Sequence, residues 1–364
     1  MSSGARRTDL PSAASVRHWL DAAIQAPASL PDEGYEALLG ADGPLLDELA
    51  ELADWWRLEH VGDALTYVVN RNLDPGMVGG DDPAARARLA ALVAEASALG
   101  ATEICMQGTP PCGAGYLALV RIVKATAPRL HLHAFRPPEL LDGAAREAMT
   151  LEEFLAAARA AGLGSVPGTA ARILDDTVRA RMMGAPDLPV RDWVAIVESA
   201  HRAGITSTAT MVFGHIETPG QQVAHLRLLA GLQDRTGGFS EFIAMPFVPA
   251  AASTAAPGLA GSGVTGPAWR EVRAVHAVAR LMLHGRIANI QAAWPKVGLE
   301  ASTALLRGGA NDLGGLLLTG RVAPEAGAEA GLSITKADVG RVARQLGRPP
   351  RQRTTTYGEV TDGA

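Results

Sequence analysis

The amino-acid sequence predicts an α/β protein whose strands form a (β/α)8 TIM-like barrel. Short apolar runs, typical of buried parallel strands, alternate with longer stretches in which apolar residues recur at every third or fourth position, as in amphipathic helices. The chain has 364 residues, which is long for one ordinary domain but normal for a single barrel of this kind. A doubly wound open sheet is the alternative. It is less favoured because no glycine-rich dinucleotide-binding fingerprint follows the first predicted strand.

The composition restricts the function classes. Hydrophobic residues make up 48% and charged residues 20%, which supplies a core and excludes wholesale disorder. The net charge is −5, whereas a sequence-independent nucleic-acid binder carries a basic excess, so no nucleic-acid partner is expected. No apolar run approaches the roughly 20 residues of a membrane span, and none follows the two N-terminal arginines. We therefore expect a cytoplasmic protein without a membrane partner.

The regions on either side of the barrel have different patterns. Residues 1–14 are small and polar and are expected to be disordered. Over residues 15–62, apolar positions recur at helical spacing between Pro, Asp and Gly breaks, which predicts a helical N-terminal cap. The barrel is predicted over 63–323. A C-terminal extension, with one short helix in KADVGRVARQL, is predicted over 324–364.

The barrel itself divides into alternating elements. Strands are predicted at 65–72, 101–108, 129–135, 162–168, 207–215, 239–248, 287–294 and 309–315. Helices are predicted at 82–99, 115–127, 151–161, 190–203, 221–235, 267–283 and 299–308. Residues 249–268 are low in complexity and are expected to form a long loop.

Polar side chains gather where these strands end, which is where a barrel places its chemistry. Each residue alone could be a cap or a loop hydrogen bond, but together they indicate a small-molecule pocket. The ligand-binding candidates are Asn70, Gln107, Arg136, Thr169, Asn289, Gln291, Trp294, Asn311 and Asp312.

Two pairs of residues are the candidates for acid–base chemistry. His131 and His133 are two apart and share a strand face, and His215 and Glu217 have the same spacing. Imidazole titrates near neutrality, so His133 or His215 is the predicted general base and Glu217 its orienting or acidic partner. A metal site built from both pairs is less favoured, and no metal is predicted. We expect His215→Ala to abolish ligand binding or turnover with little loss of stability.

Nine segments, in chain order, resemble a known family. They are TYVVNRN, GATEICMQG, HLHAF, GLGSVPGTAARILDDTVR, TATMVFGHIETP, RTGGFSEFIAMPFV, HAVARLMLHGRIANIQAAWPKVG, GANDLGG and PRQRTTTY. Together they resemble the tyrosine-dependent hydroxybenzyl transferase subunit of FO synthase, which builds a deazaflavin coenzyme. Dehypoxanthine futalosine cyclase and aminofutalosine synthase are sibling families. The resemblance implies a barrel of the radical S-adenosylmethionine (SAM) type.

The sequence departs from this family at the cluster motif. The family carries CxxxCxxC in the loop after the NRN strand, where three thiolates hold a [4Fe–4S] cluster whose open iron binds SAM. Here the loop is shorter, reads LDPGMVGGDDPAARARL and contains no cysteine. The chain has two cysteines, Cys105 and Cys112, which belong to the next strand and the loop after it. Two thiolates cannot replace three, so no [4Fe–4S] cluster is predicted, and SAM stays open only as a non-radical ligand.

Two functions are favoured by this pattern, ahead of a metal-dependent enzyme that uses the histidine pairs and of a cluster whose ligands are supplied in trans. The first is a repurposed enzyme, a transferase, lyase or isomerase, that performs non-radical acid–base chemistry in cofactor or specialised-metabolite biosynthesis, with Arg136 as an anion clamp. It is favoured because buried amides and imidazoles facing a cavity are costly to keep without a use. The alternative is a non-catalytic homologue that binds a metabolite or docks an active paralogue. Besides docking to a paralogue, the chain could assemble as a homodimer.

Overall fold

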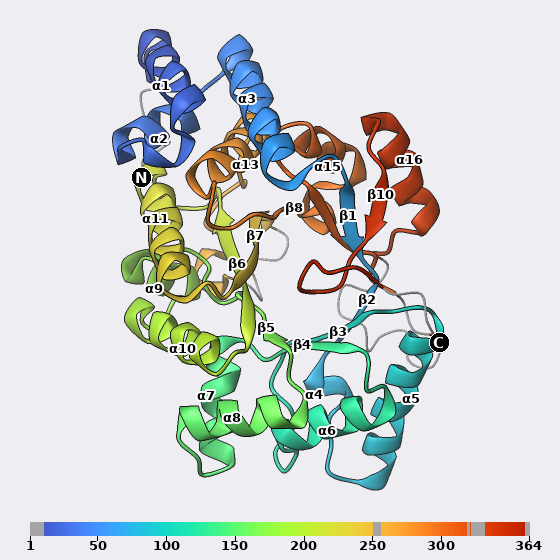
Figure 1. Ribbon diagram of the computed structural model, residues 1–364. Coiled ribbons are helices and arrows are strands. Elements are labelled where there is room, and N and C mark those ends of the chain that lie inside the picture. The colour runs from blue at the N-terminus through green and yellow to red at the C-terminus, as the bar shows by residue number, and fades with distance from the viewer. Residues whose placement is uncertain (1–10, 250–255, 319–320, 322–331, 361–364) are drawn as a thin grey trace.

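The computed structural model describes residues 11–249, 256–318, 321 and 332–360 (Figure 1). Its strands are all parallel and form one ten-stranded sheet, in the order β10-β1-β9-β8-β7-β6-β5-β4-β3-β2. β1 (Leu65–Val68) and β2 (Asn70–Leu73) are two halves of one extended stretch. β1 pairs with β9 and β2 pairs with β3, so this stretch joins the two ends of the sheet. The predicted barrel is thereby confirmed.

Each predicted strand overlaps an observed one. The other strands are β3 (Glu103–Met106), β4 (His131–Ala134), β5 (Ser165–Val166), β6 (Thr206–Phe213), β7 (Phe239–Pro246), β8 (Ile290–Ala292), β9 (Asp312–Gly315) and β10 (Pro350–Gln352). β10 was not predicted, because PRQ contains no apolar run. It pairs with β1 alongside Leu65–Tyr67 and brings the C-terminal segment into the barrel.

The helices lie outside the curled sheet (Figure 1). They are α4 (Pro75–Val78), α5 (Pro83–Ala98), α6 (Tyr116–Thr126), α7 (Pro137–Arg146), α8 (Leu151–Ala161), α9 (Asp176–Met183), α10 (Val190–Arg202), α11 (Pro219–Thr236), α13 (Trp269–Met282), α14 (Trp294–Val297), α15 (Leu299–Leu306) and α16 (Lys336–Leu346). The sequence did not predict α7, because Pro137-Pro138 resembles a turn. Proline is, however, well suited to the first position of a helix, and the Glu139 carboxylate accepts the backbone N–H of Arg136 there.

Three helices precede the barrel, α1 (Ala13–Gln25), α2 (Asp32–Leu39) and α3 (Gly43–Val61). α2 packs against α11 and α13, α3 packs against α13, and α1 packs against α2 and α3. The disorder expected over 1–14 falls mainly on residues 1–10, which lie outside the described residues, and α1 begins at Ala13. Within the loop expected over 249–268, a short 3₁₀ turn occupies Pro257–Leu259, and 250–255 lie outside the described residues. The division into cap, barrel and extension stays a prediction.

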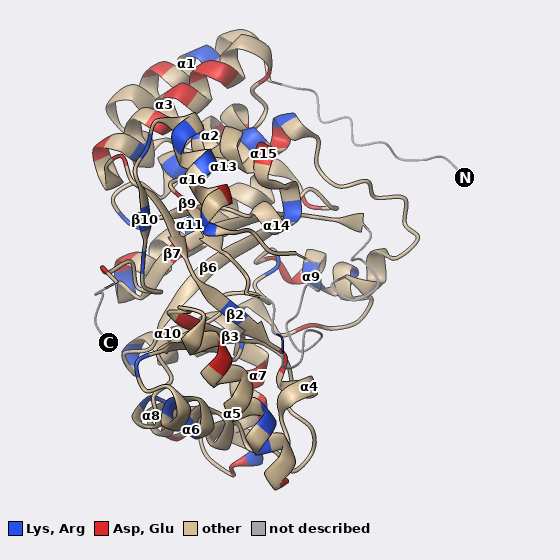
Figure 2. Ribbon diagram, turned by 90° about the vertical axis from the view of Figure 1, so that its right-hand side faces the viewer, with Lys and Arg blue, Asp and Glu red and all other residues tan. Residues whose placement is uncertain are grey.

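Apolar side chains fill the layer between the sheet and the outer helices, in two clusters. Charged residues of both signs lie on the surrounding helices (Figure 2). The barrel interior differs from this layer because several of its buried side chains are polar or charged. No described helix has both the length and the apolar character needed to cross a bilayer.

Candidate functional site

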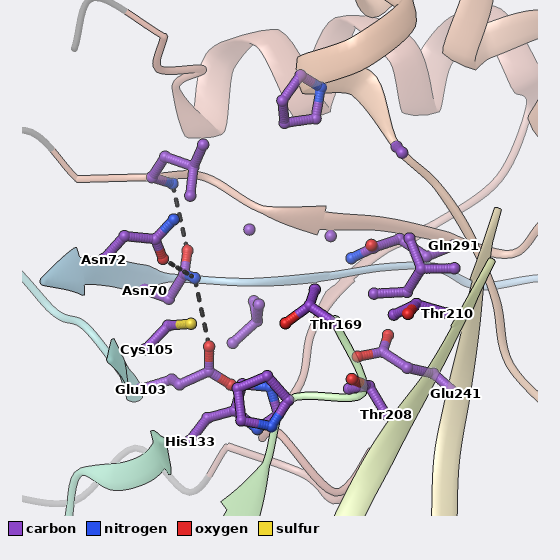
Figure 3. Close-up of a pocket in the computed structure, with 18 of the residues that line it drawn as sticks. Asn70, Asn72, Glu103, Cys105, His133, Thr169, Thr208, Thr210, Glu241 and Gln291 are labelled. Carbon is purple, nitrogen blue, oxygen red and sulfur yellow. Dashed lines mark hydrogen bonds between the residues drawn. The ribbon is translucent and has the colours of Figure 1, made fainter. Parts of the chain in front are cut away.

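A cavity of about 180 Å³ lies inside the barrel (Figure 3). Since a water molecule occupies about 30 Å³ in the liquid, this is room for about six waters or a small organic molecule. Of the predicted site residues, those that line it are Asn70, Gln107, His133, Thr169, Gln291 and Trp294. Lining residues outside that prediction include Asn72, Glu103, Thr208, Thr210, Glu241 and Arg353. The strand ends therefore do converge on one pocket.

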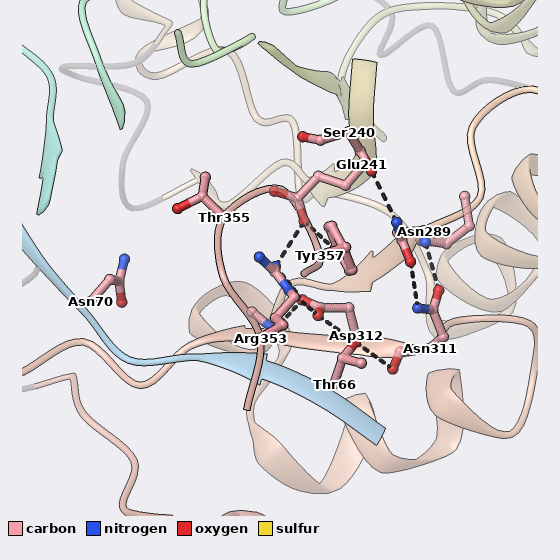
Figure 4. A network of polar contacts seen from close by, with 12 residues as sticks. Thr66, Asn70, Ser240, Glu241, Asn289, Asn311, Asp312, Arg353, Thr355 and Tyr357 are labelled. Atoms are coloured by element: carbon pink, nitrogen blue, oxygen red, sulfur yellow. Dashed lines mark hydrogen bonds and ion pairs between the residues drawn. The ribbon is translucent and has the colours of Figure 1, made fainter. Parts of the chain in front are cut away.

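Four buried charged residues at the cavity, Glu103, Glu241, Asp312 and Arg353, form with the half-buried Tyr357 a cluster that we call the floor network. Figure 4 labels all of them except Glu103. Arg353 Nε donates to Asp312 Oδ2 at 2.6 Å and its terminal nitrogen donates to Asp312 Oδ1 at 2.8 Å. The same nitrogen lies 3.1 Å from Glu241 Oε2, which also accepts the Tyr357 hydroxyl at 2.6 Å. One guanidinium thus binds two carboxyl groups.

Burial perturbs the Glu241 carboxyl. Burial raises the pKa of Glu241 to about 7; the Arg353 charge opposes this rise and the Asp312 charge adds to it. No described residue is hydrogen-bonded to Oε1 of Glu241, and Glu241 lines the cavity. A carboxyl that exchanges a proton near neutral pH therefore faces the cavity.

His133 has a different environment from the one predicted. Its Nδ1 lies 2.6 Å from the Ser165 hydroxyl oxygen. Burial lowers the pKa of His133 to about 3, and the nearby Arg353 charge lowers it further, so the ring is neutral near pH 7. At neutral pH the His133 ring can therefore transfer a proton only if one ring nitrogen takes up a proton as the other releases one, which changes its tautomer.

The amides that line the cavity are mostly anchored to their neighbours. The Asn70 amide nitrogen donates to Asn72 at 3.2 Å and to Glu103 at 3.3 Å, and the Asn70 oxygen accepts the Leu317 N–H. Gln107 accepts the Thr169 hydroxyl at 2.7 Å. These contacts fix the orientation of each amide.

Other lining groups differ in how fully they are paired. The Trp294 indole N–H donates to the Gly315 carbonyl at 3.0 Å. The Gln291 amide has no hydrogen bond from a described residue and lines the cavity. Gln291 is thus a polar group left for a ligand.

His215 and Glu217 do not reach the cavity. His215 is fully buried in the loop after β6, where Nε2 lies 3.1 Å from the Val212 carbonyl and Nδ1 accepts the Ile216 N–H at 2.7 Å. Glu217 accepts the backbone N–H groups of Gly214 at 2.5 Å and His215 at 2.9 Å. His215 Nδ1 also lies 2.9 Å from Glu217 Oε2, so the predicted pair does form, but it lies in this buried loop and not at the cavity.

Four predicted ligand-binding residues, Arg136, Asn289, Asn311 and Asp312, are not among those that line the cavity. Arg136 Nε donates to Glu139 at 2.7 Å at the start of α7, because the two residues are one helical turn apart. Asp312 belongs to the floor network. Asn311 donates to Asn289 at 3.0 Å, and Asn289 donates to the Ser240 carbonyl. The two asparagine contacts tie neighbouring strand segments together.

Sequence reasoning left Glu103, Glu241, Arg353 and Tyr357 out of the predicted site. An acidic residue within an apolar strand, as in FSEFIAMPFV, is a usable signal, because such a charge must find a buried partner. No comparable local signal marks Arg353 or Tyr357, which reach the floor only because β10 returns to β1. Among the described residues, no group of three or more His, Cys, Asp or Glu side chains is arranged to hold a metal ion.

Comparison with known proteins identifies similar chains. A family model described as the CofH/MqnC C-terminal region matches residues 236–362. FO synthase of Nocardia farcinica is 44% identical over 360 residues, which is 94% of this chain and 41% of that protein. FO synthase of Mycobacterium tuberculosis is also 44% identical, over 357 residues. The chain therefore spans about two fifths of the length of these relatives.

Solved structures share the fold at low sequence identity. Methylornithine synthase superposes with a TM-score of 0.62 and 17% identity, covering 91% of this chain and 97% of that one. An FeFe-hydrogenase maturase from Carboxydothermus hydrogenoformans gives a TM-score of 0.67 and 13% identity, covering 94% and 81%. The chain thus shares the barrel fold of these two enzymes.

One relative matches over nearly its whole length. The 5-amino-6-(D-ribitylamino)uracil–L-tyrosine 4-hydroxyphenyl transferase of Methanothermobacter thermautotrophicus is 39% identical over 344 residues, which is 89% of this chain and 93% of that protein. At this identity and coverage, the chain belongs to the family of that transferase and of the matching part of FO synthase.

Proposed function

We propose that this chain is a barrel enzyme that carries no [4Fe–4S] cluster and performs acid–base chemistry on a small polar metabolite, in cofactor or specialised-metabolite biosynthesis. The observation that carries the proposal is Glu241. One of its oxygens is held by Arg353 and Tyr357, the other is open to the cavity, and its pKa of about 7 populates both protonation states at neutral pH.

The donor set does not fit the cluster of the radical SAM families. The rim loops, which we define as residues 74–82 after β2 and 108–115 after β3, contain one cysteine, Cys112, and it is exposed. Cys105 is buried on β3, within 3.3 Å of the Gln107 amide. Three thiolates on one loop are therefore not available from this chain, and we derive no step through a cluster.

Packing between the rim loops supports the same proposal. Asp74 caps α4 by accepting the Gly76 N–H at 2.8 Å. Gly108 has a φ of +134°, and a Cβ there would lie 2.5 Å from Asp74 Oδ1. A glycine is thus required where the two loops meet, and the space next to β2 is taken by this short turn.

Iron–sulfide reconstitution tests the absence of the cluster. After anaerobic treatment of the full chain with iron, sulfide and dithiothreitol, we expect no visible absorption band and no electron paramagnetic resonance signal upon reduction. A relative that carries CxxxCxxC, treated in parallel, is the positive control. A stoichiometric [4Fe–4S] signal in this chain would overturn the proposal.

The cavity lining supports a hydroxyl- or amine-bearing substrate. Glu241 and the unpaired Gln291 amide offer acceptors and donors, and the Thr208 and Thr210 hydroxyls lie beside them (Figure 3). The archaeal relative is named for a ribitylaminouracil and for tyrosine, both of which carry such groups. We propose a metabolite of this kind as the ligand, with SAM open only as a non-radical one.

Glu241→Gln separates catalysis from binding. The amide keeps the shape of the carboxyl but cannot take up a proton near neutrality, so turnover should fall by about 10²–10⁴-fold while a ligand that copurifies with the wild type is retained. Native mass spectrometry of the purified chain identifies that ligand, which then serves as the probe for both variants. Unchanged turnover in Glu241→Gln would remove Glu241 from the mechanism.

The second candidate function is a non-catalytic metabolite-binding or scaffolding protein. The short rim loops favour it, because a barrel without chemistry has no need of a long loop at its mouth. Under this function the copurified ligand would be recovered unchanged after prolonged incubation with the wild-type chain. Cytoplasmic location, and assembly as a homodimer or with a paralogue, stay predictions.

A further inference from the structure

His131, Ser165 and His133 lie in a continuous hydrogen-bonded row inside the barrel. The Ser165 hydroxyl oxygen is 2.7 Å from His131 Nε2 and 2.6 Å from His133 Nδ1. Ser165 is opposite His133 in the pairing of β4 with β5, and it is 2% exposed. The middle of the row, at Ser165, is therefore shielded from water.

The two ends of this row open into different spaces. His133 lines the central cavity. His131, one layer lower on the same strand, lines a separate groove of about 790 Å³ beside the amino-terminal ends of β3, β4 and β5. No described residue is hydrogen-bonded to His131 Nδ1 or to His133 Nε2. One outer nitrogen thus lies on the side of the groove and the other on the side of the cavity.

We propose that His131, Ser165 and His133 form a proton relay that connects the groove at the amino-terminal face of the barrel with the central cavity. It supplies or removes the proton that the substrate exchanges with His133. The inference rests on the proposed acid–base function for its purpose. The hydrogen bonds of the floor network do not depend on this relay.

The step balances without a charged intermediate. His133 Nε2 releases its proton to the substrate while His133 Nδ1 takes the hydroxyl proton of Ser165. Ser165 takes the Nε2 proton of His131, and His131 Nδ1 takes a proton from a hydronium ion or a buffer acid in the groove, which is left as water or as the conjugate base. Both rings change tautomer, and the serine and both imidazoles end neutral. The reverse sequence removes a proton from the substrate.

The environment favours this neutral transfer over a protonated imidazole. Burial lowers the pKa of His131 to about 4 and of His133 to about 3. Around His131, the Glu103 charge raises the pKa, whereas the Lys124 charge lowers it. An imidazolium is costly here, so a relay that moves protons by exchanging tautomers has the lower barrier.

Gly164 holds the lower ring in place. A Cβ at this position would lie 2.4 Å from Cε1 of His131, so β5 can approach the imidazole closely only with glycine there. The geometry of the row is therefore built by the backbone as well as by the three side chains.

A single serine proton makes the relay testable without a substrate. Ser165 can donate to only one ring at a time, so the other ring must donate to it. Either both rings carry their proton on Nδ1 or both carry it on Nε2. In the full chain labelled with ¹⁵N-histidine, long-range ¹H–¹⁵N spectra at pH 7 should report equal tautomer populations for His131 and His133, with neither ring charged.

Ser165→Ala removes the coupling, so we expect the two populations to become unequal, whereas Ser165→Thr keeps the hydroxyl and the equality. His201 is the matched control, because it is also bonded to two hydroxyls, with Nδ1 at 2.7 Å from Thr236 and Nε2 at 2.8 Å from Ser207. The Thr236 hydroxyl donates to the Leu232 carbonyl, so it must accept from His201, whose tautomer is therefore fixed. That signal should not change in either variant.

Opposite tautomers in the wild type, or a protonated ring at pH 7, would overturn the relay, and this measurement needs no variant to fold. Equal populations that persist in Ser165→Ala would also overturn it. Because the resting protein is measured, the relay can fail while the proposed function stands. Conversely, equal tautomer populations in a chain that shows no turnover would reject the proposed enzyme function but leave the hydrogen-bonded row of His131, Ser165 and His133 supported.

Discussion

The floor network and the rim loops belong to the same barrel but hold their residues by different means. In the floor network, Arg353, Asp312 and Glu241 are buried charges that depend on one another. In the rim loops, contacts are made mainly by backbone groups, prolines and a glycine, as where the Arg146 side chain donates to the Pro110 and Pro111 carbonyls. Apart from Gly108, a rim built in this way can change its sequence with little effect on the barrel. The floor cannot, because each charge removed leaves another unpaired in a low-dielectric interior.

Arg353→Met should give the largest effect. It leaves Asp312 and Glu241 buried without their cation, so the free energy of unfolding should fall by about 3–5 kcal/mol. Urea denaturation at pH 7 measures this. Arg17→Met, which removes the exposed ion pair with Glu48, is the control and should leave the unfolding midpoint unchanged. A small loss for Arg353→Met would mean that the floor tolerates change as the rim does.

The titration of Glu241 should give the next largest effect. Its pKa is raised from 4.5 to about 7 in the folded chain, so the folded state binds the proton more tightly than the unfolded state. The stability contributed by Glu241 is therefore complete below pH 4.5 and is lost as pH rises toward 7, by up to about 3 kcal/mol. Glu241→Gln removes this dependence. The difference between the two stability-against-pH curves measures it, and parallel curves would show that Glu241 has an ordinary pKa.

His215→Ala tests a site outside both regions. The sequence led us to expect lost ligand binding with little loss of stability. The structure reverses the expectation, because His215 closes a buried loop and does not line the cavity. Unfolding free energy should fall by roughly 1–3 kcal/mol, and the copurified ligand should still bind. The exposed His18→Ala is the stability control. Lost binding in a stably folded His215→Ala chain would restore the original assignment.

The smallest effect is expected at the rim. Cys112→Ser changes an exposed side chain in a loop, so thermal stability and ligand binding should both stay near wild type, within about 0.5 kcal/mol. Cys105→Ser, on the buried strand β3, is the comparison and should cost more. A large loss at Cys112 would mean that the rim carries a function that its backbone contacts do not reveal.

Local pattern predicted much of the fold. The alternation of buried strands and amphipathic helices set the barrel, and α8 begins and ends where predicted, at Leu151 and Ala161, because a Thr150 cap and a following Gly162 mark its limits. The polar residues at the strand ends also predicted a shared pocket, and Asn70, His133 and Gln291 line one cavity. The same pattern misplaced a residue where a partner close in sequence already supplies the hydrogen bonds of its side chain. Arg136 pairs with Glu139 one turn away, and His215 with its own loop.

By itself, the sequence determined the periodicity of the chain and the number of its thiols, and both follow from residue identity alone. The tertiary structure decided which polar groups meet. Arg353 reaches Asp312 and Glu241 because β10 pairs with β1, and Ser165 joins two histidines because β5 pairs with β4. These contacts depend on the register between strands that are far apart in the sequence. The burial that results sets the pKa values of Glu241 and His133. No local pattern contains that information.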